Sequence, residues 1–338
     1  MKTRILFIFL ITLGINGCDK VRNKSYNATF PPYPTNLTEI NSEYDDYNST
    51  SPVAGETVPL CFSSTRKSGG ENFDLVYKLV NFYFMRDEGI LNIHENTSGN
   101  LDVYTRNQNI NNATFYANTP FNELGPYLIP GPMITDPRIN TYILMFSNNV
   151  NGHQDIQFTE NLVDGVYGLA KPVAFLNSEF DDAYPSFNDD FTKIYFCSNR
   201  DGQNDIFKVI VDNSVDVIDV LNDETPKTVD KVDVLSSEYE DKCPYVVEDF
   251  MVFASNREGG YGGYDLYYSY FTGGKWSGPV NFGPEINTEF DEFRPIVRPQ
   301  YDMTNDLMIF SSNRPGGKGG YDLYYVGISH LNVVVEGD

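Results

Sequence analysis

The fold is decided by a unit that is clearest near the C-terminal end of the chain. Residues 287–297 read NTEFDEFRPIV, and residues 307–326 read LMIFSSNRPGGKGGYDLYYV. An acidic lead-in precedes one apolar strand, a second strand ends in Asn313-Arg314, and Asp322 opens a returning strand after a glycine-rich turn. The four glycines of this turn are expected to supply the positive φ angles that reverse the chain at low steric cost. The unit therefore predicts a β-hairpin.

Copies of this unit recur along the chain. The acidic lead-in returns as NSEYDD, NSEFDD, SSEYED and NTEFDE, starting at residues 41, 177, 236 and 287. The hairpin triplets are Ser64-Thr65-Arg66, Ser147-Asn148-Asn149, Ser198-Asn199-Arg200, Ser255-Asn256-Arg257 and Ser312-Asn313-Arg314. An aspartate follows each turn: Asp74, Asp155, Asp205, Asp265 and Asp322. The last three triplets are evenly spaced, and the step from Asn148 to Asn199 is only slightly shorter. A period near 50 with several short strands per unit predicts β-propeller blades.

The number of blades depends on the first half of the chain. The interval from Thr65 to Asn148 is too long for one blade and too short for two. An insertion within residues 81–126 accounts for this spacing. The sequence then predicts an all-β propeller of five four-stranded antiparallel blades over residues 41–338. Residues 101–104 resemble a returning strand, so six blades is the alternative.

Three hairpins carry a resemblance to a known repeat. SNRDGQNDIF, SNREGGYGGYDLYY and SSNRPGGKGGYDLYY resemble the WD40-like (PD40-type) propeller repeat of TolB and of many lipoproteins of Gram-negative outer membranes. The segment GGKWSGPVNFGPEINTEFDEFRP, which contains Trp276, resembles the link between blades in that family. The resemblance is best over residues 177–326. It implies a propeller and a location in the cell envelope, while partners differ among members.

The N-terminal residues indicate a lipoprotein. Residues 1–17 are interpreted as a signal peptide, in which Lys2 and Arg4 precede an apolar run too short to span a bilayer. The four residues ending at Cys18 resemble the lipobox of bacterial lipoproteins, which implies lipidation of the Cys18 thiol; an ordinary signal peptide is the alternative. Residues 18–40 then form a flexible tether. These features predict a lipid anchor in the outer membrane, facing either the periplasm or the cell surface.

Charge and cysteine content exclude some functions. The formal net charge is −23, and removal of Lys2 and Arg4 leaves 22 basic against 47 acidic residues, a charge of −25. Such a chain repels nucleic acid phosphates. After Cys18 three cysteines remain, and Cys61 and Cys197 lie in apolar strand runs. We interpret them as buried thiols because no CxxC or Cys/His spacing accompanies them.

The repeated charged residues are expected to be structural. In a four-stranded blade the lead-ins and the turns emerge on one face, so each arginine can pair with a carboxylate of the lead-in or of the next strand. The arginines concerned are Arg66, Arg200, Arg257 and Arg314, and the triplet ending at Asn149 has neither an arginine nor a lead-in of this acidic form. The functional alternative is calcium, because Asp45-Asp46, Asp181-Asp182 and residues 201–205 offer oxygen ligands. None of them matches a calcium-binding loop, and no cofactor is predicted.

Three tyrosines lie on the two long glycine turns. Tyr261, Tyr264 and Tyr321 are candidate exposed anchors for a partner, because tyrosine offers a large contact area at small entropic cost. The alternative is that they pack over neighbouring blade edges.

Catalytic signals are few. The chain has no G-x-S-x-G or H-E-x-x-H motif, and His94, His153 and His330 lie in unrelated contexts. No pair for glycoside cleavage stands out among 47 acids. The function predicted is therefore a non-catalytic, lipid-anchored interaction module of an outer-membrane protein complex, and not an enzyme. The alternative is a glycan-binding or glycan-cleaving propeller at the cell surface.

Overall fold

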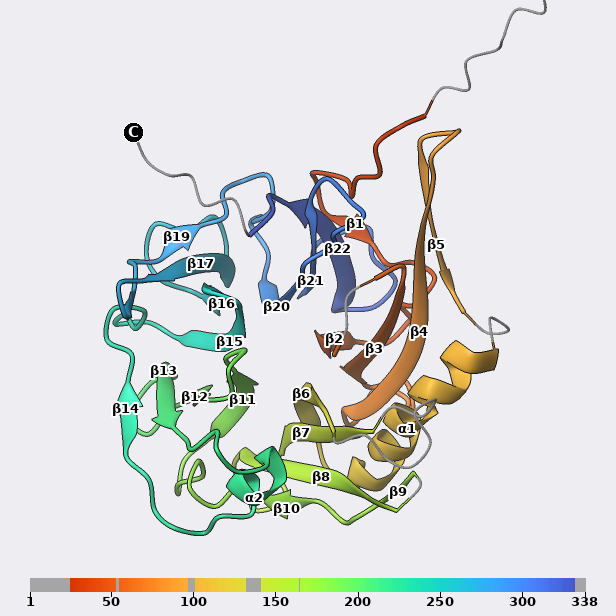
Figure 1. Cartoon of the computed structure of the whole chain (residues 1–338). Helices are drawn as coiled ribbons and strands as arrows, with labels where there is room; N and C mark the ends of the chain where they lie inside the picture. The colour runs from red at the N-terminus through yellow and green to blue at the C-terminus, as the bar shows by residue number, and fades with distance from the viewer. Residues whose placement is uncertain (1–24, 53–54, 97–100, 132–140, 164, 332–338) are drawn as a thin grey trace, which may run out of the picture.

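The chain folds into a five-bladed β-propeller, which confirms the predicted class and blade count (Figure 1). The computed structural model describes residues 25–52, 55–96, 101–131, 141–163 and 165–331. The predicted signal peptide and Cys18 lie outside the described residues. Within the described part, no helix is long and apolar enough to cross a membrane.

Each blade is an antiparallel sheet whose first strand lies nearest the axis (Figure 1). Blade 1 contains β2 (Asp46–Thr50), β3 (Thr57–Ser64), β4 (Asp74–Met85) and β5 (Ile90–Glu95). Blade 2 contains β6 (Glu123–Pro130), β7 (Tyr142–Asn148), β8 (Asp155–Val163), β9 (Val166–Tyr167) and β10 (Lys171–Pro172). Blade 3 contains β11 (Asp182–Phe187), β12 (Lys193–Ser198), β13 (Asp205–Ile210) and β14 (Val229–Lys231), with α2 (Val217–Leu221) before β14. Blade 4 contains β15 (Asp241–Val247), β16 (Phe250–Ser255), β17 (Asp265–Thr272), β18 (Lys275–Trp276) and β19 (Val280–Asn281).

Blade 5 is completed by the N-terminal part of the chain. Its strands β20 (Glu292–Arg298), β21 (Asp306–Ser312) and β22 (Asp322–Ile328) are joined by β1 (Thr35–Asn36), which pairs with β22. Residues 25–40, expected to belong to a flexible tether, instead pack on this blade and on the β4–β5 hairpin of blade 1, and Phe30 and Leu37 are buried. The two ends of the propeller are thereby held together, because one sheet contains strands from both.

The segment expected to hold an insertion contains regular structure. Strand β4 continues past the edge of the disc and pairs with β5 in a long hairpin (Figure 1). Helix α1 (Leu101–Ala117) follows and packs against β4 and β7. Residues 101–104, which resembled a returning strand, belong to this helix, so they provide no sixth blade.

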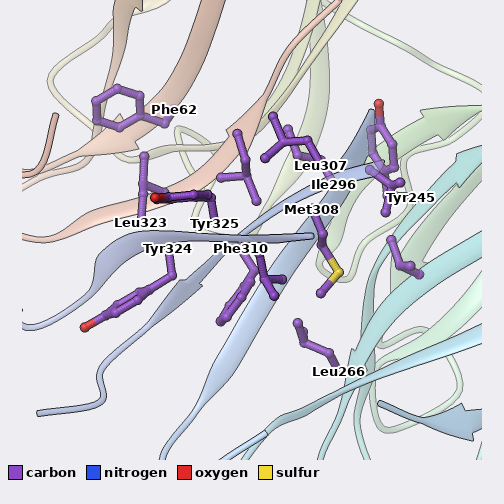
Figure 2. Close-up of a cluster of buried hydrophobic side chains, with 14 of the residues drawn as sticks. Phe62, Tyr245, Leu266, Ile296, Leu307, Met308, Phe310, Leu323, Tyr324 and Tyr325 are labelled. Atoms are coloured by element: carbon purple, nitrogen blue, oxygen red, sulfur yellow. The ribbon is translucent and has the colours of Figure 1, made fainter. Parts of the chain in front are cut away.

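The hydrophobic core lies between the blades. The inner strands are buried on both faces and read as almost continuous apolar runs, as in β7 and β21. Figure 2 shows Leu323 of blade 5 beside Phe62 of blade 1, and Ile296 and Met308 of blade 5 on the side of Tyr245 and Leu266 of blade 4, all in one buried cluster. Each sheet therefore uses its two neighbours to cover its faces.

A β-bulge interrupts the first strand of every blade. The register shifts within β2, β6, β11, β15 and β20, and each bulge contains one residue with φ between 46° and 59°. These residues are Asn48, Gly125, Tyr184, Cys243 and Arg294. A Cβ atom at Gly125 would overlap the ring of Tyr184, so the glycine makes room for that tyrosine on the axis.

Candidate functional site

The arginines of the repeat are paired with the last acid of the lead-in and not with the aspartate of the third strand. Their Nη2 to carboxylate distances are 2.5 Å for Arg66–Asp46, 2.6 Å for Arg200–Asp182, 2.5 Å for Arg257–Asp241 and 2.8 Å for Arg314–Glu292. All four acids are fully buried. Each guanidinium also donates to the carbonyl oxygen of the residue just before the lead-in and to a serine hydroxyl, for example Arg257 to Leu235 O and Ser255 Oγ. These contacts hold the lead-in against the hairpin of its own blade.

The aspartates that open the third strands have a different role. Asp265 accepts the backbone N–H groups of Tyr261 and Gly262, and Asp322 accepts those of Lys318 and Gly319. Asp155 contacts Asn151 and His153, and Asp205 contacts Lys231. Asp74 is the corresponding aspartate of blade 1, and burial raises the pKa of its carboxyl group. In the long turns these carboxylates hold the loop closed, as Asx residues commonly do.

The glycines of the long turns mainly permit close approach. In the last turn only Gly316 has a positive φ, of 96°. A Cβ atom at Gly319 would overlap the Tyr44 carbonyl oxygen, one at Gly320 would overlap Asp45, and one at Gly317 would overlap Asp322. The expectation that all four glycines serve to reverse the chain is corrected. Two of them let the turn lie on the next lead-in, and a third makes room for the aspartate that closes the turn.

Two rings of hydrogen bonds join each blade to the next. In the first ring, the residue before each third strand offers its carbonyl oxygen to the backbone N–H of the last acid in the following lead-in, over 2.7–2.8 Å. In the second ring, the same residue donates to the lead-in side chain that precedes this acid. The pairs are Phe73 N to Asn122, Gln154 N to Asp181, Asn204 Nδ2 to Glu240, Tyr264 N to Asp291 and Tyr321 N to Asp45. Both rings are complete over five blades.

The rings reveal a fifth lead-in, in blade 2, that does not stand out in the sequence. Residues 118–123 read NTPFNE, and Glu123 occupies the position of Asp182. The signal was present as an Asn-Thr pair followed by an aromatic residue and a final acid. It was hidden because proline and asparagine, Pro120 and Asn122, stand where the other lead-ins have acids.

On the face of the propeller that carries the lead-ins and the turns, the two rings of hydrogen bonds surround an axial pocket of about 260 Å³. It is lined by Tyr47, Gln154, Asp181, Ala183, Tyr184, Asn204, Lys242, Tyr264, Phe293 and Tyr321. Two of the tyrosines expected as exposed anchors, Tyr264 and Tyr321, therefore point to the axis. Tyr261 remains on the surface with 49% of its area exposed.

One wall of the axial pocket is aromatic. Tyr47 stacks on Phe293 with ring centroids 5.3 Å apart, and Tyr321 lies 4.9 Å from Tyr47. Tyr264 meets Phe293 edge to face at 4.9 Å. The Tyr321 hydroxyl donates to Asp291 over 2.8 Å; burial and this acid raise the pKa of the phenol. The rings are thus fixed against one another and offer a rigid apolar surface.

The opposite wall is polar. The Gln154 side-chain oxygen is buried without a hydrogen-bond partner among the described residues. Lys242 Nζ lies 2.6 Å from Glu240 Oε2, which also accepts a bond from Asn204. Burial opposes the charge of Glu240, but the bonds from Lys242 and Asn204 outweigh it and lower the pKa of this carboxyl. Glu240 therefore stays ionised.

The floor of the axial pocket is a buried plug. Tyr184 closes it, and the Arg294 guanidinium carbon lies 5.6 Å from the centre of its ring. Arg294 is fully buried and donates to the carbonyl oxygens of Pro244 and Pro126. These acceptors and the ring stabilise a cation that burial would otherwise disfavour.

The cysteines and the acidic clusters are weaker candidates for a functional site than the axial pocket. Cys61, Cys197 and Cys243 are free and buried, and burial raises the pKa of Cys61 and of Cys197 to about 12, so these thiols are inert. Across the described ranges, no group of three or more His, Cys, Asp or Glu side chains could hold a metal ion. Two of the candidate calcium ligands, Asp46 and Asp182, are already bound by arginines.

Comparisons with known proteins identify the fold. No family model matches the sequence, and no curated protein matches it. Among solved structures, an endo-arabinase from Bacteroides thetaiotaomicron is 12% identical, with 90% of this chain and 99% of that chain covered and a TM-score of 0.51. A structure described as a glycoside hydrolase is 7% identical, with 90% and 94% covered and a TM-score of 0.51. A TolB-type structure from Agrobacterium tumefaciens is 14% identical, with 81% and 71% covered and a TM-score of 0.35.

These neighbours correct the predicted function. The endo-arabinase and the glycoside hydrolase match over nearly their whole length. The prediction of a non-catalytic interaction module, and with it the prediction that the chain is not an enzyme, is wrong as the leading interpretation. The alternative, a glycan-binding or glycan-cleaving propeller, is taken up below as a proposal. At these identities the likeness establishes the fold, and the activity of this chain has to be argued from its own residues.

Proposed function

We propose that this protein is a carbohydrate-active propeller that binds a sugar in the axial pocket and cleaves a glycosidic bond there. The observation that carries the proposal is the pairing of an aromatic wall with a polar wall that contains the unpaired Gln154 oxygen. A sugar ring has an apolar face and a polar edge, so it suits both walls at once. A ligand hydroxyl would satisfy Gln154, because buried acceptors are normally paired.

The carboxylates of the rim are the candidates for the chemistry. Glycosidic bonds are commonly cleaved by two carboxyl groups, one acting as acid and the other as base or nucleophile. Asp181 lines the pocket, and Asp291 binds the hydroxyl of Tyr321. Glu240 stays ionised beside Lys242 and is suited to a base or to charge stabilisation. Because an endo-arabinase is among the structural neighbours, arabinan is the first substrate to test.

The experiment measures release of reducing ends from arabinan, galactan, xylan and mannan by the wild type and three variants. Asp181→Asn and Asp291→Asn remove a charge but keep an acceptor, and Asn122 shows that an amide can fill this place in the ring. We expect each to lower the rate at least 100-fold on the substrate that is cleaved. Tyr261→Ser is the control, since this tyrosine is exposed and outside the pocket. Equal rates in all variants would remove the axial pocket as the site, and binding without cleavage would reduce the proposal to a lectin-like role.

We further propose that Cys18 carries a lipid and holds the domain on the outer membrane, as in the WD40-like repeat lipoproteins that the hairpins resemble. This rests on the lipobox-like residues before Cys18 alone. Cys18→Ala should move the protein from the membrane fraction to the soluble fraction or leave an uncleaved precursor. If a Cys18→Ala protein that has been cleaved still fractionates with the membrane after a salt wash, lipid anchoring is contradicted.

A further inference from the structure

The N-terminal segment meets the propeller at the face opposite the axial pocket. Strand β20 begins beside the pocket and is seven residues long, so the loop of residues 299–305 that follows it lies about 20 Å away, at the other end of the strands. In this loop Thr304 donates its backbone N–H to Ala28 O, and Tyr26 N donates to Arg86 O at the tip of the β4–β5 hairpin. The N-terminal segment is therefore fixed between the loop and the hairpin tip (Figure 1).

The hairpin tip is also held against the loop. The Arg86 guanidinium donates to Asp302 O over 3.0 Å. Arg86 and Asp302 line a hollow of about 570 Å³ together with Tyr83 and with Ser25, the first described residue. The hairpin, the loop and the start of the described chain thus form one continuous surface. We call it the N-terminal surface, and it consists of residues 25–28, 83–90 and 299–305.

Large apolar side chains are exposed on the N-terminal surface. Tyr83 exposes 47% of its area, Ile90 exposes 48% and Tyr301 exposes 84%. Because Tyr83 pairs with Asn92 and Met85 pairs with Ile90, Tyr83 and Ile90 lie on the same face of the hairpin. Tyrosine is enriched where an apolar bilayer meets its polar headgroups, since the side chain has an apolar ring and a polar tip. The exposed side chains therefore suit the surface of a membrane.

The chain between Cys18 and the propeller is short. Six residues separate Cys18 from Ser25, and seven steps along an extended chain reach at most about 25 Å. From Ser25 onward the chain packs on blades 1 and 5. A lipid on Cys18 would thus keep the N-terminal surface within this distance of the bilayer. Contacts that are weak by themselves become effective when a tether holds the two partners together.

The charge of the N-terminal surface restricts the kind of lipid. Its one cation, Arg86, is accompanied by three exposed acids, which are Asp87, Glu88 and Asp302. The whole chain also has a net charge of −23. Anionic headgroups are therefore repelled, and zwitterionic headgroups are the class that fits.

We propose that the N-terminal surface rests on a bilayer of zwitterionic phospholipid, so that the axial pocket opens away from the membrane. This inference rests on the proposed lipid at Cys18 and is independent of the proposed sugar cleavage. Tyr83, Ile90 and Tyr301 enter the headgroup region, while the lead-ins and the long turns face the aqueous side. A pocket in this orientation receives ligands from solution.

The test compares how close two labels lie to the bilayer. A fluorophore is attached to the full-length, lipidated protein at Asp87→Cys on the hairpin tip, or at Glu258→Cys on the exposed long turn of blade 4. The native thiols of Cys61, Cys197 and Cys243 are buried and do not react. In phosphatidylcholine vesicles whose headgroups carry a nitroxide quencher, the label at position 87 should be quenched at least three-fold more strongly than the label at position 258.

A surface variant tests which side chains make the contact. The triple change Tyr83→Ser/Ile90→Ser/Tyr301→Ser should weaken quenching of the label at position 87 at least three-fold, while the acylated protein stays on the vesicles. Tyr261→Ser is the matched control, because Tyr261 exposes 49% of its area on the opposite face, and it should leave the quenching unchanged. Thermal melts establish that each variant is folded.

Failure of the anchor and failure of the orientation give different results. A mature protein whose Cys18 carries no acyl chain by mass spectrometry removes the anchor and this inference together. If the protein is acylated and the label at position 258 is quenched as strongly as the label at position 87, the anchor stands and the orientation is overturned. Sugar cleavage is not a readout here, so its absence affects only the proposed function.

Three further outcomes overturn the contact surface itself. Unchanged quenching in the triple variant means that the three apolar side chains do not touch lipid. Quenching that appears only in phosphatidylglycerol vesicles contradicts a zwitterionic headgroup. Energy transfer between labels at position 87 of different molecules, without quenching by lipid, assigns the N-terminal surface to contact with a second copy of the chain.

Discussion

In blades 1, 3, 4 and 5 the buried acid that ends the lead-in pairs with an arginine, whereas in blade 2 the arginine position is occupied by Val150. The strand registers make this equivalence explicit, since Glu123 pairs with Asn148 as Asp182 pairs with Ser198, and the arginine position lies two residues further on. Glu123 is fully buried, and one of its carboxyl oxygens lacks a hydrogen-bond partner among the described residues. The other accepts the hydroxyl of Thr119 over 2.5 Å.

The missing arginine affects the ionisation of Glu123. Burial raises the pKa of Glu123 from its ordinary 4.5 to about 7, with Asp74 adding to the shift while Thr119 and Lys67 oppose it. Asp46, Asp182 and Asp241 are equally buried but face a guanidinium at 2.5–2.6 Å. The comparison teaches that the repeat keeps the buried acid for its hydrogen bonds to the lead-in, and that in four blades an arginine gives this acid a cationic partner.

The largest effect is expected from breaking one of the four pairs. Arg257→Ala leaves the carboxylate of Asp241 buried without its cation, so unfolding free energy should fall by about 3–5 kcal/mol. The measurement is chemical denaturation at pH 7. Val150→Ala changes the equivalent position in blade 2 and should have almost no effect. A loss below about 1 kcal/mol for Arg257→Ala would show that the pair behaves as an exposed one.

Replacing Glu123 is expected to change the free energy of unfolding by a smaller amount, and to raise it. Between pH 4.5 and about 7 the folded state holds this proton and the unfolded state does not, so stability falls as the pH rises through that window. A shift of this size corresponds to about 3 kcal/mol as an upper value. Glu123→Gln should therefore stabilise the protein by up to that amount at pH 8 and by little at pH 4.5.

The measurement for Glu123 is the difference between wild-type and variant melting curves at several pH values. Taking the difference cancels the titration of the other acids. Asp182→Asn serves as the contrast, because it removes the acid from a blade that has an arginine and should destabilise at pH 8. A wild-type minus variant difference that does not change with pH would contradict the account.

Restoring the missing pair should stabilise blade 2. The double change Asn148→Ser/Val150→Arg gives blade 2 the serine and arginine found in the other blades, and we expect a gain on the order of 1–2 kcal/mol at pH 8. The pH-dependence attributed to Glu123 should disappear with it. Adding Glu123→Gln to this background should then lower the stability. If it raises the stability instead, the new arginine does not reach the carboxylate.

The smallest effect on stability is expected in the ring around the axial pocket. Asp291→Asn keeps an oxygen that can accept the Tyr264 N–H group, as Asn122 does for Phe73, so the change in unfolding free energy should stay below about 1 kcal/mol. Denaturation curves check this independently of activity. A much larger loss would mean that the charge of Asp291, and not only its oxygen, closes the ring.

Much of the fold could be predicted because it repeats. The regular spacing of the hairpin triplets, their serines and arginines, and the acidic lead-ins located four of the five blades. Blade 2 was harder to predict. Its lead-in NTPFNE keeps the hydrogen bonds of the other lead-ins but has only one acid, Glu123. Its hairpin triplet corresponds to residues 148–150, one position later than the predicted Ser147-Asn148-Asn149. The closing strand Thr35–Asn36 was missed because two residues carry no periodicity and their partner strand lies at the opposite end of the chain.

The candidate site could be predicted only in part. The turns that carry Tyr264 and Tyr321 could be recognised in the sequence. The direction of the two side chains, toward the axis, could not, because a glycine-rich sequence does not show which lead-in it will lie against. Gln154 and Asn204 gave no signal at all, being ordinary amides between a turn and a strand. The partner of each arginine also remained open between two carboxylates until the hairpin geometry was known.

The sequence by itself determined the repeat, the blade as a unit of local hairpins, and the acidic character of one face, because these follow from patterns that recur from one blade to the next. Only the tertiary structure decided what the five blades make together. Closure of the ring brings Tyr47, Gln154, Lys242 and Phe293 around one axis, though they come from four different blades. Such a site depends on the angle between blades, which is set by packing across every interface, and no local segment of the chain encodes it.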